Sequence, residues 1–547
     1  MDRSPARLNL EHLKKQAKEL IRLYRRQAPE ALSRFRRSLP SASGRSDADI
    51  IALNLRLHDA QSCIARDLGF ASWPNLRRYV EAQLPPGKSK ADRVRRWLQL
   101  VYASDIDGGS NRAHPRVAAR MLAEDPGLVA GDPYLACAVG DEAAVQQAAA
   151  NDPAWVNRAG GPLRLPPLVA VAHSSLLQLP GFQPRLLRCA RLLLQAGADP
   201  NQRIGSRWPP GTLAAPDDSN PLSALYGAAG QNHDLELTRL LLEAGGDPND
   251  GESLYHSLDA FVTTGILLEH GARIPEAYAM YKVLDTENVA ALALLLQHGG
   301  NPNEPARNAP TSDSGSPLMW AIRRRRSRRC IAMLLDAGAD PHAATPNGVS
   351  AYRYALQFGL SEVAELLRER AGAEPLTDDE LFVAACTSGN EREARQIRAA
   401  RPDLPATLSP QQLRLLPELA AAGADDAVRL MVELGWPIAV RAGDWDASAL
   451  NHAVFRGNAG LTRFLLEHGA QWTEQHGFGD NASGSLSWAS CNEPVEDGDW
   501  AGCAQALLDH GMPHGIPDRD DPEWLLVAGR KKLFSDEVRE VLLGDAA

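Results

Sequence analysis

Apolar residues recur along most of the chain with the spacing of one helical face, and five segments share a longer pattern. In each, a leucine-rich stretch ends at a glycine, and polar residues follow, in most copies with a proline among them. Glycine allows the positive φ with which a chain leaves a helix, and proline prevents the helix from continuing. The pattern therefore predicts a helix that ends in a turn. The five copies are ARLLLQAGADPN (190–201), TRLLLEAGGDPN (238–249), LALLLQHGGNPN (292–303), IAMLLDAGADPH (331–342) and TRFLLEHGAQWT (462–473).

A second apolar stretch with helical spacing precedes several copies, so each unit is expected to be a pair of helices. The pair and its turn, which ends in Leu-Leu-x-x-Gly-Ala-Asp-Pro-Asn, resemble the ankyrin repeat. The five steps between the turn glycines Gly197 and Gly372 average 35 residues, against a family period of about 33. No copy carries the complete Thr-Pro-Leu-His start of the family. The resemblance implies an all-α ankyrin-repeat solenoid with divergent, irregular repeats.

The amino-terminal region follows a different pattern. Leu13, Leu20 and Tyr24 lie on one face of a predicted helix, and lysine and arginine occupy most of the other face, which indicates an amphipathic helix. The segments LEHLKKQAKEL and DAQSCIARDLGFASWPNL resemble a helical module often fused ahead of ankyrin arrays in bacterial proteins. A small helical domain is therefore expected before the repeats.

We expect three parts: a basic helical module at 1–90, a first ankyrin-repeat array at 91–375 and a second array at 376–547. The second array begins with a segment (378–404) whose layout is that of a first repeat. It is either separate from the first array or continuous with it, because solenoid repeats contact only their neighbours.

Composition and charge narrow the class of protein. Apolar residues make up 44% of the chain and aromatic residues only 6%, which is typical of a globular helical protein. Seven scattered cysteines without a Cys-x-x-Cys pair suggest neither a disulfide framework nor a zinc site. With no apolar targeting segment and no stretch of about 18 apolar residues, we expect a cytoplasmic protein outside the membrane. Residues 1–90 hold 18 Lys+Arg and 9 Asp+Glu, whereas the whole chain has a net charge of −10.

The sequence contains no phosphate-binding loop, nucleophile elbow or His-Glu-x-x-His motif, so an enzyme is less favoured, and we expect no cofactor and no metal. Four histidines each precede a turn glycine and are interpreted as helix caps: His270, His298, His468 and His510. The run from Arg323 to Arg329 holds six arginines at a turn between two helices. It is interpreted either as an anion-binding patch or as a solvated turn paired with neighbouring carboxylates.

The candidate binding site is in the carboxyl-terminal repeats, where tryptophans gather in an otherwise aromatic-poor chain. Two finger loops, the segment around Trp445 and the insertion from Thr473 to Gly484, join one helix pair to the next. Ankyrin arrays typically bind through such loops and the first helices, and tryptophan is a frequent anchor of binding surfaces. The candidate residues are Trp445, Asn451, His452, Trp472, His476, Asp480, Asn481 and Trp488. These tryptophans are equally compatible with filling gaps between irregular repeats.

The resemblance implies an adaptor that binds a macromolecular partner, most simply a protein, on the concave surface of fingers and first helices. One alternative is an enzyme or small-molecule site near His452, His476, Asp480 and Cys491. The other is nucleic-acid binding through the basic module, which the acidic remainder of the chain disfavours. The identity of the partner and the oligomeric state stay open.

Overall fold

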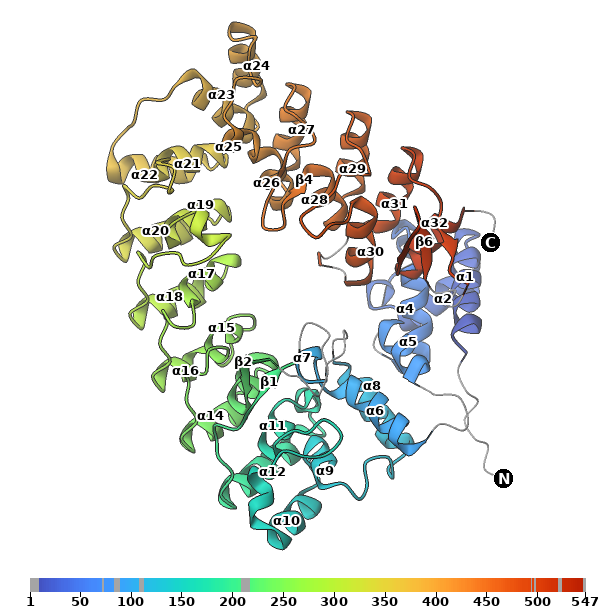
Figure 1. Ribbon diagram of the computed structural model, residues 1–547. Helices are drawn as coiled ribbons and strands as arrows, with labels where there is room; N and C mark the ends of the chain where they lie inside the picture. The colour runs from blue at the N-terminus through green and yellow to red at the C-terminus, as the bar shows by residue number, and fades with distance from the viewer. Residues whose placement is uncertain are drawn as a thin grey trace. The chain divides into compact units, whose positions relative to one another are not determined.

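The computed structural model describes residues 9–70, 73–82, 89–107, 113–207, 217–492, 494–495, 498–519 and 524–544. It is 58% helical, with few and short strands, which confirms the all-α prediction (Figure 1). The chain divides into two compact units, Met1–Ala279 and Met280–Ala547.

The amino-terminal part of the first unit is a group of short helices. They are α1 (Leu10–Arg25), α2 (Pro29–Ser38), η1 (Pro40–Ala42), α3 (Asp47–Ala52), α4 (Leu57–Asp67), α5 (Trp73–Ala82), α6 (Lys90–Val101), α7 (Ser104–Asp107) and α8 (Pro115–Glu124). α4 packs against α1, α2 and α5, and α5 also packs against α8. The apolar face predicted for the first helix is buried, and the Tyr24 hydroxyl donates a hydrogen bond to the Ile50 carbonyl at 2.8 Å.

The rest of the first unit is a stack of helix pairs. Its helices are α9 (Pro133–Val139), α10 (Glu142–Asn151), η2 (Pro153–Asn157), α11 (Pro167–Ala172), η3 (Ser175–Gln178), α12 (Gln183–Gln195), α13 (Ala224–Tyr226), η4 (Gly227–Gln231), α14 (Leu235–Glu243), α15 (Ser253–Ser257) and α16 (Thr264–Glu269). First helices pack in a row, α9 to α11 to α13 to α15, and second helices do the same from α10 to α16. Each pair thereby covers an apolar face of the next. An antiparallel hairpin of β1 (Arg203–Ser206) and β2 (Asp217–Ser223) lies between α12 and α13.

The second unit has the same arrangement. Its helices are α17 (Ala279–Lys282), η5 (Val283–Asp285), α18 (Val289–Gln297), η6 (Thr311–Asp313), α19 (Pro317–Arg323), α20 (Arg328–Asp336), α21 (Ala351–Gln357), α22 (Ser361–Ala371), α23 (Asp378–Thr387), α24 (Glu391–Ala400), α25 (Pro410–Leu413), α26 (Leu415–Ala422), α27 (Asp425–Glu433), α28 (Ala449–Phe455), α29 (Ala459–Glu467), α30 (Ala482–Asn492), α31 (Trp500–Asp509) and α32 (Asp536–Leu543). The first residue of α17 belongs to the first unit.

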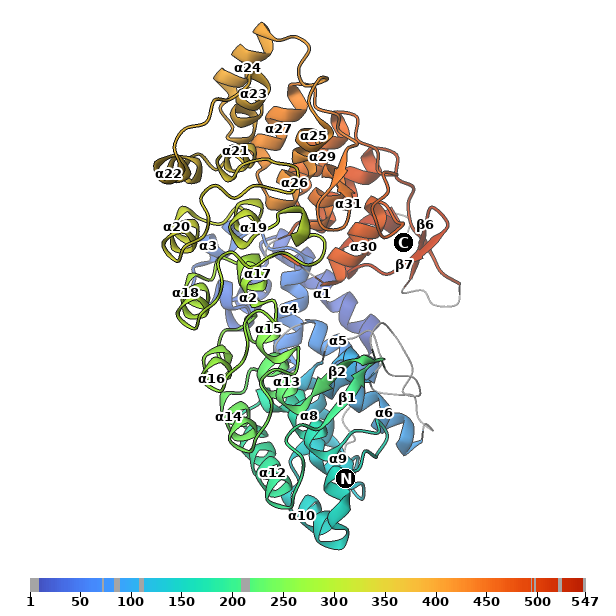
Figure 2. The same cartoon turned by 60° about the vertical axis from the view of Figure 1, so that its left-hand side comes forward.

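First helices of this unit pack from α19 to α21 to α23 and from α26 to α28 to α30, and second helices from α18 to α22 and from α27 to α31. Two antiparallel sheets complete it: β3 (Arg441–Ala442) with β4 (Ala447–Ser448), and β5 (Ile516–Pro517) with β6 (Leu525–Val527) and β7 (Arg530–Lys532). Figure 2 shows β6 and β7 beyond α30 and α31.

Helix α21 packs on α23, so the stack of helix pairs continues across residue 375. The domain boundaries at 90 and 375 stay predictions.

The helices end where the sequence pattern predicted. The turn glycines of the five copies all have φ between +85° and +99°, a region that glycine enters at little cost. The four histidines interpreted as caps are confirmed as such, because each Nδ1 lies 2.8 to 3.0 Å from the carbonyl oxygen four residues earlier. Each ring therefore adds a side-chain hydrogen bond to a carbonyl in the last turn of its helix.

Asparagines link four of the turns to the turn that follows. The side-chain amide donates to the carbonyl of the next turn glycine at 2.8 to 3.3 Å, and Oδ1 accepts from the backbone N–H two residues beyond that glycine at 2.8 to 2.9 Å. Four asparagines do this: Asn157, Asn201, Asn249 and Asn303. Pro275 and His342 occupy the same position in two other turns, and a proline ring has no group that can make these bonds.

We expect Asn201→Ala to lower the free energy of unfolding by about 1 to 2 kcal/mol, because the Gly245 carbonyl and the Asp247 N–H lose their partner. Asn308→Ala is the matched control, since Asn308 is exposed and its side chain makes no hydrogen bond within the described chain. Urea denaturation followed by circular dichroism measures both. An equal loss of stability in the two variants would contradict a role for the asparagine link.

Candidate functional site

The candidate residues come from two finger loops and two neighbouring first helices. Trp445 lies in the loop between β3 and β4, and β4 leads directly into α28. His476, Asp480 and Asn481 lie in the loop that precedes α30, and Trp488 is on α30 itself. Because α28 packs directly on α30, the fold brings both loops and both helices together.

Five side chains from these elements form an aromatic cluster: Trp445, Phe455, His476, Phe478 and Trp488. The Trp445 ring meets His476 edge to face at 5.1 Å between centroids and stacks on Phe478 at 6.5 Å, and it also contacts Phe455 at 5.5 Å. Phe455 stacks on Trp488 at 5.3 Å. Phe478 is 81% exposed and Trp488 51% exposed. The cluster therefore has a packed interior and two rings that face solvent.

Sequence reasoning missed Phe455 and Phe478. Phe478 lies within the insertion from Thr473 to Gly484, so its place in a finger loop was a usable signal. Phe455 is the last residue of α28, and only the packing of that helix on α30 shows that it touches Trp488.

Asn451 and His452 are buried beneath the cluster, with 0% and 2% exposure. Asn451 donates to the Glu474 carbonyl at 3.0 Å and accepts from the Ser485 hydroxyl at 3.0 Å. His452 Nε2 lies 3.2 Å from the Ala442 carbonyl, and its ring lies edge to face against Trp445 at 4.7 Å. Both side chains therefore hold the finger loops on α28.

Backbone contacts also fix the finger loops. The Gly443 N–H donates to Glu418 Oε1 at 3.3 Å, and the Gly477 N–H donates to the Trp445 carbonyl at 3.0 Å. A Cβ at Gly477 would lie 2.7 Å from that carbonyl oxygen, which is too close for two atoms that are not bonded. Only glycine allows the two finger loops to approach each other in this way.

Asp480, Asn481 and Trp472 have surroundings different from those of the cluster. Asp480 is paired with Lys532, which is only 5% exposed, and with Arg530 at 3.2 Å, both on β7. Asn481 accepts a hydrogen bond at 3.0 Å from a backbone N–H in the first turn of α30. The half-buried Trp472 has no ring contact with the cluster among the described side chains. Asp480 and Asn481 therefore anchor the loop before α30.

An ion-pair network, here called the brace, joins α19 to the finger loop of Trp445. Arg323 lies 2.9 Å from Glu418 and 3.6 Å from Asp444, and Arg324 lies 2.7 Å from Asp444 and 3.1 Å from Asp285. The Arg323 side chain is 7% exposed and that of Glu418 17%. Because Asp444 directly precedes Trp445, the brace fixes the loop at the residue where the cluster begins.

Other arginines of the same run also have partners. Arg326 lies 3.8 Å from Glu287, and Arg325 donates to the Phe358 carbonyl. These contacts favour pairing with neighbouring groups over an anion-binding patch. Arg323 is buried rather than solvated, which the sequence pattern did not indicate.

Among the described residues, no group of three or more histidine, cysteine, aspartate or glutamate side chains could hold a metal ion. The same residues include no helix that is long and apolar enough to cross a membrane. Cys491, which belonged to the alternative small-molecule site, is exposed, and its Sγ lies 3.7 Å from the Leu533 carbonyl.

Comparison with known proteins identifies the repeat. Residues 315–346, which comprise α19, α20 and the following turn, match the family model "Ankyrin repeat". The fold is an ankyrin-repeat solenoid. This ankyrin assignment rests on that match and on the stacked helix pairs with their turn glycines.

Two solved ankyrin structures were among those found. The human ASB11 ankyrin repeat domain is 21% identical over 43% of this chain and 98% of that chain, with a TM-score of 0.21. The ankyrin repeat domain of Bcl-3, described as a unique member of the IkappaB protein family, is 20% identical over 48% and 97%, with a TM-score of 0.22. No curated protein matches the chain.

We expect Glu418→Gln to lower the free energy of unfolding by about 2 to 3 kcal/mol, because it leaves the buried Arg323 guanidinium without its nearest anion. Glu433→Gln is the matched control, since Glu433 pairs with Arg395 at 2.7 Å but both side chains are more than 40% exposed. This change should cost less than about 1 kcal/mol. Chemical denaturation measures the free energy of unfolding of both variants. Similar losses of this free energy in the two variants would show that the brace does not stabilise the fold.

We expect acid to lower the free energy of unfolding, because two histidines in and beneath the cluster are buried. Burial lowers the pKa of His452 and of His476 below the usual value of an imidazole. The unfolded chain takes up protons as the pH falls through about 6.5, whereas the folded rings remain neutral, so acid favours unfolding. The free energy of unfolding should fall by up to about 1.4 kcal/mol per pH unit for each histidine below pH 6.5.

Urea denaturation between pH 7.5 and pH 5 checks this for wild type and His452→Gln. The variant should lose less stability on acidification than the wild type. His298→Gln, at an exposed capping ring, should instead follow the wild type. Parallel curves for all three proteins would contradict the expectation.

Proposed function

We propose that the protein is a cytoplasmic adaptor that binds a protein partner on the aromatic cluster, the two finger loops and the first helices α28 and α30. The observation that carries the proposal is the exposure of Phe478 and Trp488 on a cluster whose other rings are packed. Aromatic rings of this kind are the usual anchors of protein interfaces.

Burying these rings against a partner stabilises a complex by about 25 cal/mol for each Å² of apolar surface removed from water. The rings are already held by their neighbours, so they lose little side-chain freedom on binding. The partner that suits this surface is a protein segment with apolar side chains that cover the faces of Phe478 and Trp488.

The alternative functions receive less support. His452 is buried and engaged with the Ala442 carbonyl, and Asp480 is paired with Lys532, so neither offers a free group for catalysis. For nucleic-acid reading by the amino-terminal module, α5 would have to reach base edges. Trp73, at the start of α5, is only 7% exposed.

The cytoplasmic location rests on the cysteines. The structure has all seven as thiols rather than disulfides, and six of them are buried. Cysteines that remain thiols are typical of a reducing compartment.

The decisive test is the double variant Phe478→Ala/Trp488→Ala. Proteins captured from extracts of the native cell by wild type and variant are quantified by mass spectrometry. The captured amount of a true partner should be lower by about tenfold or more with the variant than with the wild type. A tenfold change corresponds to about 1.4 kcal/mol of binding free energy. The melting temperature should change little, because both rings are largely exposed. Trp445→Ala is unsuitable for this test, because Trp445 packs against several rings and its removal would destabilise the site.

The matched control is Val262→Ala/Ile516→Ala, which removes two other exposed apolar side chains, 53% and 65% exposed. It should capture the same proteins as the wild type. Equal capture by wild type and by the Phe478/Trp488 variant would refute the proposed surface, and so would equal losses in the two double variants.

A further inference from the structure

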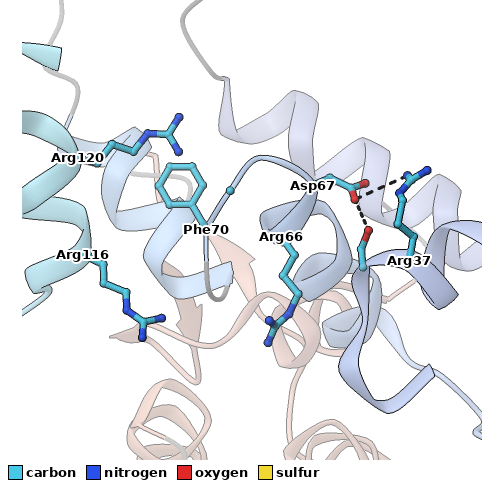
Figure 3. Close-up of a pocket in the computed structure, with 8 residues that line it drawn as sticks. Arg37, Arg66, Asp67, Phe70, Arg116 and Arg120 are labelled. Atoms are coloured by element: carbon cyan, nitrogen blue, oxygen red, sulfur yellow. Dashed lines mark hydrogen bonds and ion pairs between the residues drawn. The ribbon is translucent and has the colours of Figure 1, made fainter. Parts of the chain in front are cut away.

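A pocket in the first unit is lined mainly by arginine side chains. It has a volume of about 750 Å³ and lies between the carboxyl-terminal ends of α2 and α4 on one side and α8 on the other. Figure 3 shows Arg66 and Arg116 extending in the same direction on the two sides of Phe70. The lining residues are Arg37, Ser38, Arg66, Asp67, Gly69, Phe70, Arg116 and Arg120.

Asp67, the one carboxylate among the described lining residues, already has partners. Asp67 lies 2.7 Å from Arg34, which is outside the lining, and it also accepts a hydrogen bond from the Ser38 hydroxyl. Arg37 is a distant partner at 3.9 Å. Asp67 therefore has little capacity left to neutralise the other arginines.

Arg120 is held in place by its surroundings. Its guanidinium carbon lies 4.2 Å from the Phe70 ring centroid and 4.8 Å from that of Tyr79. Its Nη1 donates to the Leu68 carbonyl at 3.0 Å, and its Nε lies 3.2 Å from Glu124. This wall of the pocket is therefore preorganised, because rings, carbonyl and carboxylate together fix the side chain.

Arg66 and Arg116 are different, because neither has an ion-pair partner within the described chain. Arg66 makes one long hydrogen bond, 3.4 Å to the Ser62 hydroxyl, and both arginines are exposed. Like charges that share a pocket repel each other, and a bound anion removes that repulsion. Guanidinium groups bind phosphate oxygens with two parallel hydrogen bonds each.

We propose that this pocket binds a small compound with two or more linked phosphate groups, with Arg66 and Arg116 as its principal ligands and Arg120 as the fixed wall. The volume falls within the range of about 300 to 1,000 Å³ that small-molecule sites occupy. Two sources share this chemistry, inorganic oligophosphate and the oligophosphate of a nucleotide.

The test is calorimetric titration of the full chain with inorganic tripolyphosphate at low salt. We expect saturable binding that weakens by about tenfold in Arg66→Gln, by about tenfold in Arg116→Gln and by more in the double variant, because each change removes charge-assisted hydrogen bonds. Arg95→Gln is the matched control, since Arg95 is an exposed arginine of α6 outside the pocket. It should bind tripolyphosphate as the wild type does.

A parallel titration with ATP separates the two sources. Equal affinity for ATP and tripolyphosphate assigns the pocket to the phosphate chain alone, and tighter binding of ATP assigns it to a nucleotide; either result supports the proposal. The proposal is overturned if tripolyphosphate does not bind, or if Arg95→Gln loses as much affinity for it as Arg66→Gln and Arg116→Gln do. The proposal is also overturned if a single-stranded oligonucleotide binds more tightly than tripolyphosphate and if Arg66→Gln and Arg116→Gln weaken that binding. The pocket would then belong to a nucleic-acid surface.

Discussion

The structure depends on how the chain leaves the second helix of each pair. In most pairs a turn glycine with positive φ ends this helix, and the chain then turns back so that the next pair lies against the last. Neither helix of a pair can bury its apolar face alone, so stability comes from the contact between neighbours. The asparagine links add hydrogen bonds to the same contact, and they connect turns that are 22 to 44 residues apart along the chain.

The candidate surface is a consequence of that stacking combined with longer contacts. α28 and α30 are neighbours because their repeats are neighbours, and this brings Phe455 against Trp488. The brace then holds the preceding finger loop from α19 and α26, while Gly477 lets the second loop approach Trp445. The exposed rings are therefore supported by buried polar groups at several points in the sequence.

Local features of the fold could be predicted from the sequence. The turn glycines, the histidine caps and the buried face of the first helix each depend on residues within about one helical turn, so their pattern is visible in the sequence. For the candidate site, the sequence indicated the region and Trp445, His476 and Trp488. It could not show that Asn451 and His452 are buried, or that Asp480 pairs with Lys532, because those environments depend on distant segments. The pairing of Arg323 with Glu418, 95 residues away, has no signal in either local pattern.

The brace also bears on the mechanical behaviour of the second unit. A stack of repeats bends easily, because a small rotation at each interface adds up along the array. Arg323 and Glu418 belong to helices separated by the pairs of α21 to α24, so their contact ties together repeats that are not neighbours. The brace therefore restricts how far the repeats between α19 and α26 can rotate against one another. This part of the array is therefore stiffer than a stack held only by contacts between neighbouring repeats, because a force that stretches it also acts on the ion pairs of the brace.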